Sequence, residues 1–216
     1  MTKKIKIALV DDFNVMRTAL ANFMDGVDDF EVVFQAETKE EFISKMEWEN
    51  KPNVIIMDYN LGEDSGVDCI KHVREEYGDD IYIIGLSMYK DLYVVSEILN
   101  AGANGFLFKG CSTQEIIDGI RDVCENGFTV NKYTSSLVFG KKTNEEEEDL
   151  FKQLNDTEKQ IIKHICLQET NEQMARELNL SLHTVNSYRK LILKKLKCKN
   201  SAGLVLFAVK NGIFHI

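Results

Sequence analysis

Short apolar runs alternate with helical patterns along the first 125 residues. Five of these runs are rich in β-branched or aromatic residues and too brief for a helix, which is typical of buried strands in a parallel sheet. They cover residues 5–10, 31–36, 54–58, 81–86 and 105–108. After each run, apolar residues recur at helical spacing, within 15–24, 42–46, 67–74, 92–99 and 116–123. The alternation predicts a doubly wound, five-stranded parallel sheet of the flavodoxin-like type.

The pattern changes after the last of these helices. Periodicity fades between Gly127 and Asp149, and residues 145–149 form an acidic run. Such a run is usually a solvated linker. The alternative interpretation is that it mimics nucleic acid and covers a basic segment of the same chain. We predict one domain at 1–126, a linker at 127–149 and a second domain at 150–216.

The second domain is predicted to be small and all-α. Asn155-x-x-Glu158 and Thr170-x-x-Gln173 have the spacing of capping boxes, and each precedes apolar residues at helical spacing. Ser181 can cap a longer helix, over about 182–197. The turn between these last two helices is tight, which predicts a helix-turn-helix.

The helix over 182–197 has two different sides at about 100° per residue. One stripe is apolar and is expected to pack inward; it contains Val185, Tyr188, Ile192 and Leu196. The opposite side is cationic and amide-bearing, with His183, Asn186, Ser187, Lys190, Lys194 and Lys197. Such a face suits phosphates and base edges in a major groove. The alternative is a merely solvated basic helix.

The charge is divided unevenly between the domains. Residues 1–124 contain 12 Lys and Arg against 24 Asp and Glu, whereas residues 150–216 contain 11 against 5. Only the second domain is therefore expected to meet nucleic acid. No apolar run approaches the roughly 20 residues of a membrane helix. The five cysteines form no C-x-x-C pair, as expected of reduced thiols in a cytoplasmic protein.

Four of the predicted strands end in residues that carry chemistry. Asp11 and Asp12 end the first, Asp58 ends the third, Ser87 follows the fourth and Lys109 follows the fifth. In a doubly wound sheet the first and third strands are neighbours, so their carboxylates should cluster and bind a hard cation such as Mg²⁺. The lysine and the hydroxyl would neutralise a phosphoryl group on one carboxylate. Alone, each residue would be read as a helix cap, a turn former or a surface charge.

These residues, with Gly66 and Phe106, make residues 4–125 resemble the receiver domain of a two-component response regulator. The resemblance implies that Asp58 accepts a phosphoryl group from a sensor histidine kinase. It implies that Mg²⁺ binds Asp12, Asp58 and the Asn60 main-chain carbonyl, with Asp11 acting through water. Ser87 and Lys109 would contact the phosphoryl oxygens, and Phe106 would be the switch aromatic. Gly62 stands where many receivers have Pro.

Residues 150–216 are similar to the DNA-binding domain of the LuxR/NarL class. The resemblance rests on a pattern of residues spread over this segment: Leu154, Glu158, Ala175, Leu178, Ser181, Thr184-Val185, Tyr188, Ile192, Lys195-Leu196 and Asn211-Gly212-Ile213. It implies base reading by Asn186, Ser187 and Lys190, with Arg189 and Lys194 nearer phosphates. In that class a last helix, here from about 201 to 211, forms the dimer contact; its apolar residues could equally be core.

The sequence as a whole predicts a phosphorylation-controlled transcriptional regulator of the NarL/FixJ family, active as a homodimer on double-stranded DNA. We expect it to act on no membrane and no small-molecule substrate, and to catalyse only its own phosphorylation and dephosphorylation. One alternative is a phosphohydrolase, which would need an acid where Asn60 stands. Another is a phosphorylation-independent DNA-binding regulator whose receiver serves as a dimerisation module.

Overall fold

A computed structural model describes residues 4–46, 51–129, 153–210 and 213–214. The amino-terminal domain is built on a sheet of five strands paired in the order β2-β1-β3-β6-β7. Every pairing in this sheet is parallel, which confirms the doubly wound fold. The strands are β1 (Ile5–Val10), β2 (Phe30–Ala36), β3 (Val54–Asp58), β6 (Tyr82–Ser87) and β7 (Gly105–Phe108).

Helices cover both faces of the sheet because alternate residues of each strand point to opposite sides. In β1, Ile7 and Leu9 join the core under α1 and α5, whereas Ala8 and Val10 join the core under α2, α3 and α4. The strands are apolar on both faces, as expected of a buried parallel sheet. The helices are α1 (Asn14–Asp25), α2 (Lys39–Met46), α3 (Gly66–Tyr77), α4 (Leu92–Ala101) and α5 (Thr113–Asn126).

The structure differs from the sequence prediction in several details. The fourth strand of the main sheet lies one residue later than predicted, so Ser87 is its last residue. A two-stranded hairpin, β4 (Asn60–Leu61) and β5 (Asp64–Ser65), follows β3 and was not predicted, because strands this short show no periodicity. Val15 matches the apolar spacing of α1 but is 72% exposed. The acidic run at 145–149 lies outside the described residues.

The carboxy-terminal domain is helical, as predicted. It contains α8 (Asp156–Cys166), α9 (Asn171–Glu177), α10 (Leu182–Lys195) and α11 (Ser201–Lys210). Both expected capping boxes are present, since Asn155 and Thr170 each exchange hydrogen bonds with the residue three positions later. Ser181 caps α10 by accepting a hydrogen bond from the Thr184 amide. No helix of the described ranges is long and apolar enough to span a membrane.

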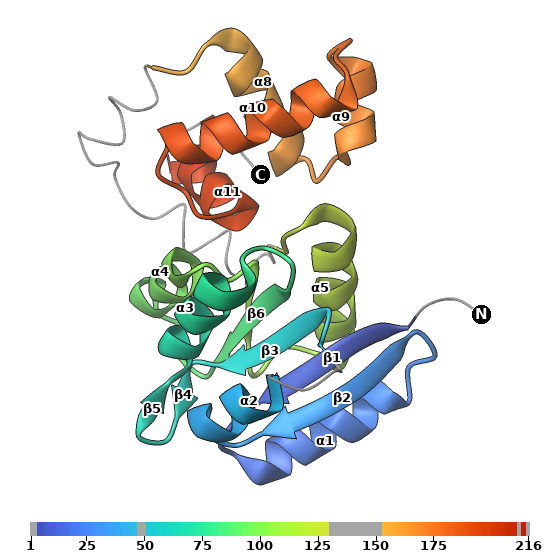
Figure 1. Cartoon of the computed structure of the whole chain (residues 1–216), viewed down its shortest axis with the longest axis vertical. Coiled ribbons are helices and arrows are strands. Elements are labelled where there is room, and N and C mark those ends of the chain that lie inside the picture. Colours follow the sequence, from blue (N-terminus) through green and yellow to red (C-terminus); the bar gives the residue numbers. More distant parts are fainter. Residues whose placement is uncertain (1–3, 47–50, 130–152, 211–212, 215–216) are drawn as a thin grey trace.

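The helical domain packs against α4 and the loop that leads into β7 (Figure 1). Asn200 is buried at this contact, and its amide donates hydrogen bonds to the main-chain carbonyls of Gly102 (2.9 Å) and Ala103 (2.6 Å). One cluster of buried apolar residues runs from the α2–α4 side of the sheet into the helical domain. Leu204 and Ala208 of α11 belong to it and are fully buried. Within this chain these residues of α11 are therefore core.

Candidate phosphorylation site and nucleic-acid interface

The carboxyl ends of the central strands bring the predicted acidic residues together. Register in the sheet aligns Val10 with Met57, so Asp11 follows β1 at the level where Asp58 ends β3. Asp11, Asp12 and Asp58 each present a carboxylate oxygen, and these oxygens lie within 4.8 Å of one another. Asp11 and Asp58 are buried, while Asp12 is exposed at the rim. The neighbourhood inferred from strand order is thus present in the structure.

Lys109 joins the two buried carboxylates. Its Nζ lies 2.7 Å from Oδ2 of Asp11 and 2.7 Å from Oδ2 of Asp58. Burial raises the pKa of Asp58 to about 6, against the lowering effect of the Lys109 hydrogen bond, and the charge of Asp11 adds to the rise. Burial alone would lower the pKa of Lys109, but its bonds to the two carboxylates hold that pKa above its usual value. The site therefore has an excess of negative charge that a cation would relieve.

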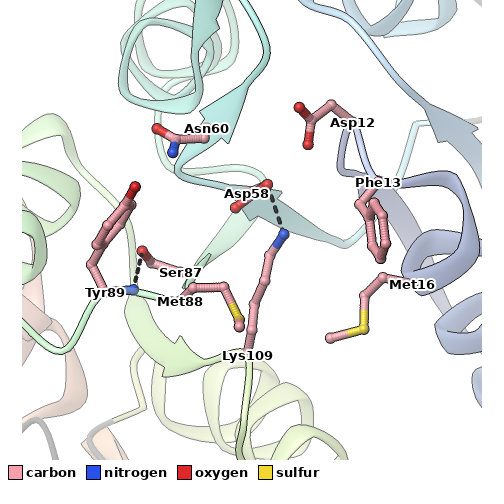
Figure 2. Close-up of a pocket in the computed structure, with 9 residues that line it drawn as sticks. All are labelled: Asp12, Phe13, Met16, Asp58, Asn60, Ser87, Met88, Tyr89 and Lys109. Atoms are coloured by element: carbon pink, nitrogen blue, oxygen red, sulfur yellow. Dashed lines mark hydrogen bonds and ion pairs between the residues drawn. The ribbon is translucent and has the colours of Figure 1, made fainter.

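Figure 2 shows the other predicted residues around Asp58. The side chains of Ser87, Asn60 and Lys109 border one hollow together with Asp58. Ser87 is 1% exposed, and its hydroxyl oxygen accepts a hydrogen bond from the Tyr89 amide at 3.0 Å, which fixes the oxygen beside the carboxylate. Phe106, the predicted switch aromatic, is fully buried in the core and lines no part of the hollow.

Two glycines shape the backbone beside this carboxylate. A Cβ on Gly66 would lie 1.8 Å from the main-chain oxygen of Asp58, so only glycine allows α3 to begin so close to β3. Gly62 has a φ of +67°. Proline is confined to a φ of about −65°, so the backbone at position 62 could not hold the proline that many receivers have there.

Two contacts near the site were not foreseen from the sequence. The Arg17 guanidinium is buried and donates to the Asp11 carbonyl and to Glu37, and so holds the loop that carries the first two acidic residues. The sequence feature that could have identified this contact is the position of Arg17 on the buried stripe of α1, which it shares with Ala21 and Met24. Tyr59 donates from its hydroxyl to Glu97 of α4 at 2.7 Å. That bond, with burial, raises the pKa of Tyr59 to about 12.

The donor set at the strand ends fits Mg²⁺. Mg²⁺ prefers hard oxygen ligands and binds through one or two carboxylates with retained water. Here two buried carboxylates and one exposed carboxylate converge, and no nitrogen or sulfur ligand belongs to the cluster. The hairpin places Asn60 immediately beside the same hollow. These residues can therefore bind a cation that would neutralise the excess negative charge of the site.

In the helical domain, α10 presents the face predicted for nucleic acid. Val185 and Ile192 are buried. Every residue assigned to the outer side is exposed, namely His183, Asn186, Ser187, Lys190, Lys194 and Lys197. Asn171 of α9 donates a hydrogen bond to Asn186, which holds that amide at the surface.

Arg189 lies elsewhere, turned toward the amino-terminal domain. Its guanidinium donates to Asn171 and to Ser201, the latter at 2.7 Å. It lines a hollow between the domains together with Tyr82 and Glu169. Burial there lowers the pKa of Arg189. In this arrangement the side chain does not join the exposed face of α10.

Comparison with known proteins matches each domain to a family. Residues 7–121 match the response regulator receiver domain, and residues 152–208 match the bacterial regulatory proteins of the luxR family. The response regulator GacA of Pseudomonas protegens is 28% identical over 209 residues, covering 97% of each chain. The oxygen regulatory protein NreC of Staphylococcus carnosus is 30% identical over 217 residues, covering 97% of this chain and 99% of NreC.

The same architecture occurs among solved structures. RcsB from Salmonella enterica serovar Typhimurium, bound to promoter rprA in the presence of the phosphomimetic BeF3-, superposes with a TM-score of 0.56 at 17% identity. The match covers 97% of this chain and all of the RcsB chain. At this identity the likeness concerns the fold alone, and it spans both domains.

Proposed function

This chain belongs to the response regulators that join a receiver domain to a LuxR-type DNA-binding domain, and from that premise we propose that Asp58 is its phosphorylation site. It is a DNA-binding regulator of a two-component system. The observation that carries the assignment of Asp58 is the Lys109 ammonium, 2.7 Å from the carboxylates of Asp11 and Asp58 at the ends of two adjacent strands.

The proposed reaction transfers a phosphoryl group from a histidine of a sensor kinase to Asp58. An Asp58 carboxylate oxygen forms the new bond to phosphorus as the bond to the histidine nitrogen breaks. Mg²⁺, held by Asp12, Asp58 and the Asn60 carbonyl with Asp11 through water, would neutralise charge on the phosphoryl oxygens. The chain's own contribution is placement, because Ser87 and Lys109 border the hollow where those oxygens would lie.

Phosphorylation would release Lys109 from its present partners. Its ammonium now bridges two carboxylates, and a phosphoryl group on one of them offers a more highly charged partner. Lys109 follows β7 directly and its amide donates to the Ser87 carbonyl. A shift of the ammonium would therefore move the ends of both β6 and β7. Water would later remove the phosphoryl group by hydrolysis. Phosphorylation and dephosphorylation of Asp58 would be the only reactions that the receiver catalyses.

The output of this switch is DNA binding by α10. Asn186, Ser187 and Lys190 occupy its exposed face and would read base edges, with Lys194 on phosphates. Arg189 would contact phosphates only after leaving its partners Asn171 and Ser201. We infer that the docked domains represent the resting state and that phosphorylation favours a homodimer in which they separate. RcsB, which shares the fold, has been solved on promoter DNA.

The decisive experiment treats the full chain with acetyl phosphate and Mg²⁺ and measures intact mass and DNA affinity. Wild type should gain one phosphoryl group and bind DNA more tightly, while Asp58→Ala should do neither. Asp28→Asn is the matched control, because Asp28 is an exposed carboxylate outside the acidic cluster. An adduct that persists in Asp58→Ala would refute the assignment of the site. DNA binding that is equal in all samples would support the phosphorylation-independent alternative.

A further inference from the structure

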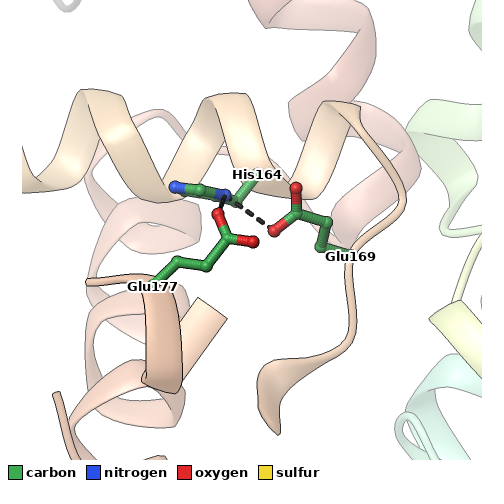
Figure 3. Close-up of side chains that lie close together, drawn as sticks. All are labelled: His164, Glu169 and Glu177. Carbon is green, nitrogen blue, oxygen red and sulfur yellow. Dashed lines mark hydrogen bonds and ion pairs between the residues drawn. The ribbon is translucent and has the colours of Figure 1, made fainter. Parts of the chain in front are cut away.

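Three potential metal ligands converge in the carboxy-terminal domain, away from the receiver site (Figure 3). His164 comes from α8, Glu169 from the turn after α8, and Glu177 is the last residue of α9. The His164 Nδ1 lies 2.8 Å from Oε2 of Glu169 and 3.6 Å from Oε2 of Glu177. All three ligand atoms lie within 4.8 Å of one another.

These separations suit a transition metal. Zinc bonds to imidazole nitrogen and carboxylate oxygen at about 2.0–2.2 Å, so two ligands of a tetrahedral ion lie about 3.3–3.5 Å apart. The observed nitrogen–oxygen distances of 2.8 and 3.6 Å fall on either side of that value. Shifts of about half an ångström in the side chains would bring the ligands to bonding geometry. The backbone between His164 and Glu169 is held in place, because the Glu169 amide donates a hydrogen bond to the His164 carbonyl at 3.1 Å.

The charge of the cluster also favours a cation. Two carboxylates face a single imidazole nitrogen, which can bring at most one proton to them. Among the described residues, no Lys or Arg forms an ion pair with Glu169 or Glu177. The His164 and Glu169 side chains are only 17% and 21% exposed, so water screens them poorly. A divalent ion would neutralise the cluster.

We propose that His164, Glu169 and Glu177 bind one Zn²⁺ ion. A set of one imidazole and two carboxylates is too rich in nitrogen for Mg²⁺ and suits zinc. Glu177 is 59% exposed, so water reaches the ion and completes its coordination. The three ligands belong to α8, the α8–α9 turn and the end of α9. The ion therefore clamps the helix that precedes the helix-turn-helix to its first helix, and the site is independent of phosphorylation at Asp58.

The competing explanation is that a protonated His164 alone pairs with the two glutamates. The two explanations differ in what they require. An ion triad forms without metal, whereas the zinc site needs the ion and loses a ligand when any one of the three side chains is changed. Metal affinity in single variants separates them.

The experiment titrates Zn²⁺ by calorimetry into full-length protein stripped with EDTA, with thiols reduced and millimolar Mg²⁺ present to occupy the receiver. Co²⁺ absorption then reports ligand geometry. His164→Gln and Glu177→Gln are compared with wild type and with His72→Gln. His72 is the matched control, since it lies on α3 outside the cluster. Circular dichroism checks that each variant is folded.

Wild type and His72→Gln should bind one Zn²⁺ per chain, and both cluster variants should lose more than about tenfold in affinity, since even residues that only support a metal ligand cost 10- to 100-fold. Zn²⁺ should also raise the unfolding temperature of wild type but not of folded His164→Gln. Affinity within twofold of wild type in either cluster variant would overturn the proposal and would place any zinc on the cysteines. Absence of binding to wild type would leave the ion triad as the explanation.

Discussion

Replacing Asp58 by asparagine should stabilise the receiver while it abolishes phosphorylation. Asp58 and Asp11 are nearly inaccessible, with side chains 5% and 6% exposed, and they share one ammonium. One negative charge in this buried cluster is therefore uncompensated in the absence of metal. Asparagine keeps the shape of the side chain and removes that charge. The carboxylate that we propose as the phosphorylation site therefore costs the wild-type receiver stability.

The size of the effect follows from the pKa. A pKa raised from 3.8 to about 6 corresponds to about 3 kcal/mol of cost for the ionised form. The folded state holds the proton more tightly than the unfolded state, so stability falls as pH rises between about 4 and 6 and is level above that range. Because asparagine also weakens the bond to Lys109, we expect a net gain of about 1–3 kcal/mol at pH 7.5. At pH 4.5 the destabilisation caused by ionising Asp58 should fall to about 1 kcal/mol.

Hydrogen exchange of the β3 amides provides the assay, because these amides lie in the centre of the sheet and report opening of the receiver separately from the helical domain. Wild type, Asp58→Asn and Asp28→Asn are compared in EDTA at several pH values, with intrinsic exchange rates corrected. Addition of Mg²⁺ should stabilise wild type and leave Asp58→Asn nearly unchanged. The reasoning fails if Asp58→Asn is no more stable than wild type at pH 7.5, or if its gain is equally large at pH 4.5.

Three further predictions concern packing. Gly66→Ala places a Cβ 1.8 Å from the Asp58 carbonyl oxygen, so thermal unfolding should show a loss of more than about 3 kcal/mol; an unchanged midpoint would show that α3 can shift freely. Asn200→Ala removes two hydrogen bonds to receiver carbonyls, and small-angle scattering should show a larger radius of gyration, whereas equal radii would mean that apolar contacts suffice. Glu158 is fully buried and pairs with Lys195 at 2.6 Å, while the lysine side chain is 36% exposed, so water still screens its charge. Glu158→Gln should therefore cost the helical domain about 1–2 kcal/mol. Chemical unfolding followed by far-UV circular dichroism measures this, and an unchanged free energy of unfolding would contradict it.

Features that depend on neighbouring residues could be predicted from the sequence alone. The five main strands follow from short apolar runs, and the carboxylates at their ends follow from the order in which such strands pair. A capping box involves groups only three residues apart, so its spacing can be read from the sequence. The boxes predicted at Asn155 and Thr170 are both present in the structure. The two sides of α10 follow from helical periodicity, and the exposed side is the one predicted.

Other features arose only from the tertiary structure. The hairpin at Asn60 is too short to produce a pattern, and its position depends on Gly66 passing close to the backbone of β3. Arg189 is a cationic residue of the predicted DNA-binding helix, yet the packing of α9 and α11 against α10 gives its guanidinium the partners Asn171 and Ser201 instead. Asn200 likewise has its partner in the receiver, and the ligands around His164 come from separate segments of the helical domain. Their partners come from other elements of the fold, and no local spacing records which elements will meet, because that is decided by the packing of whole helices and domains.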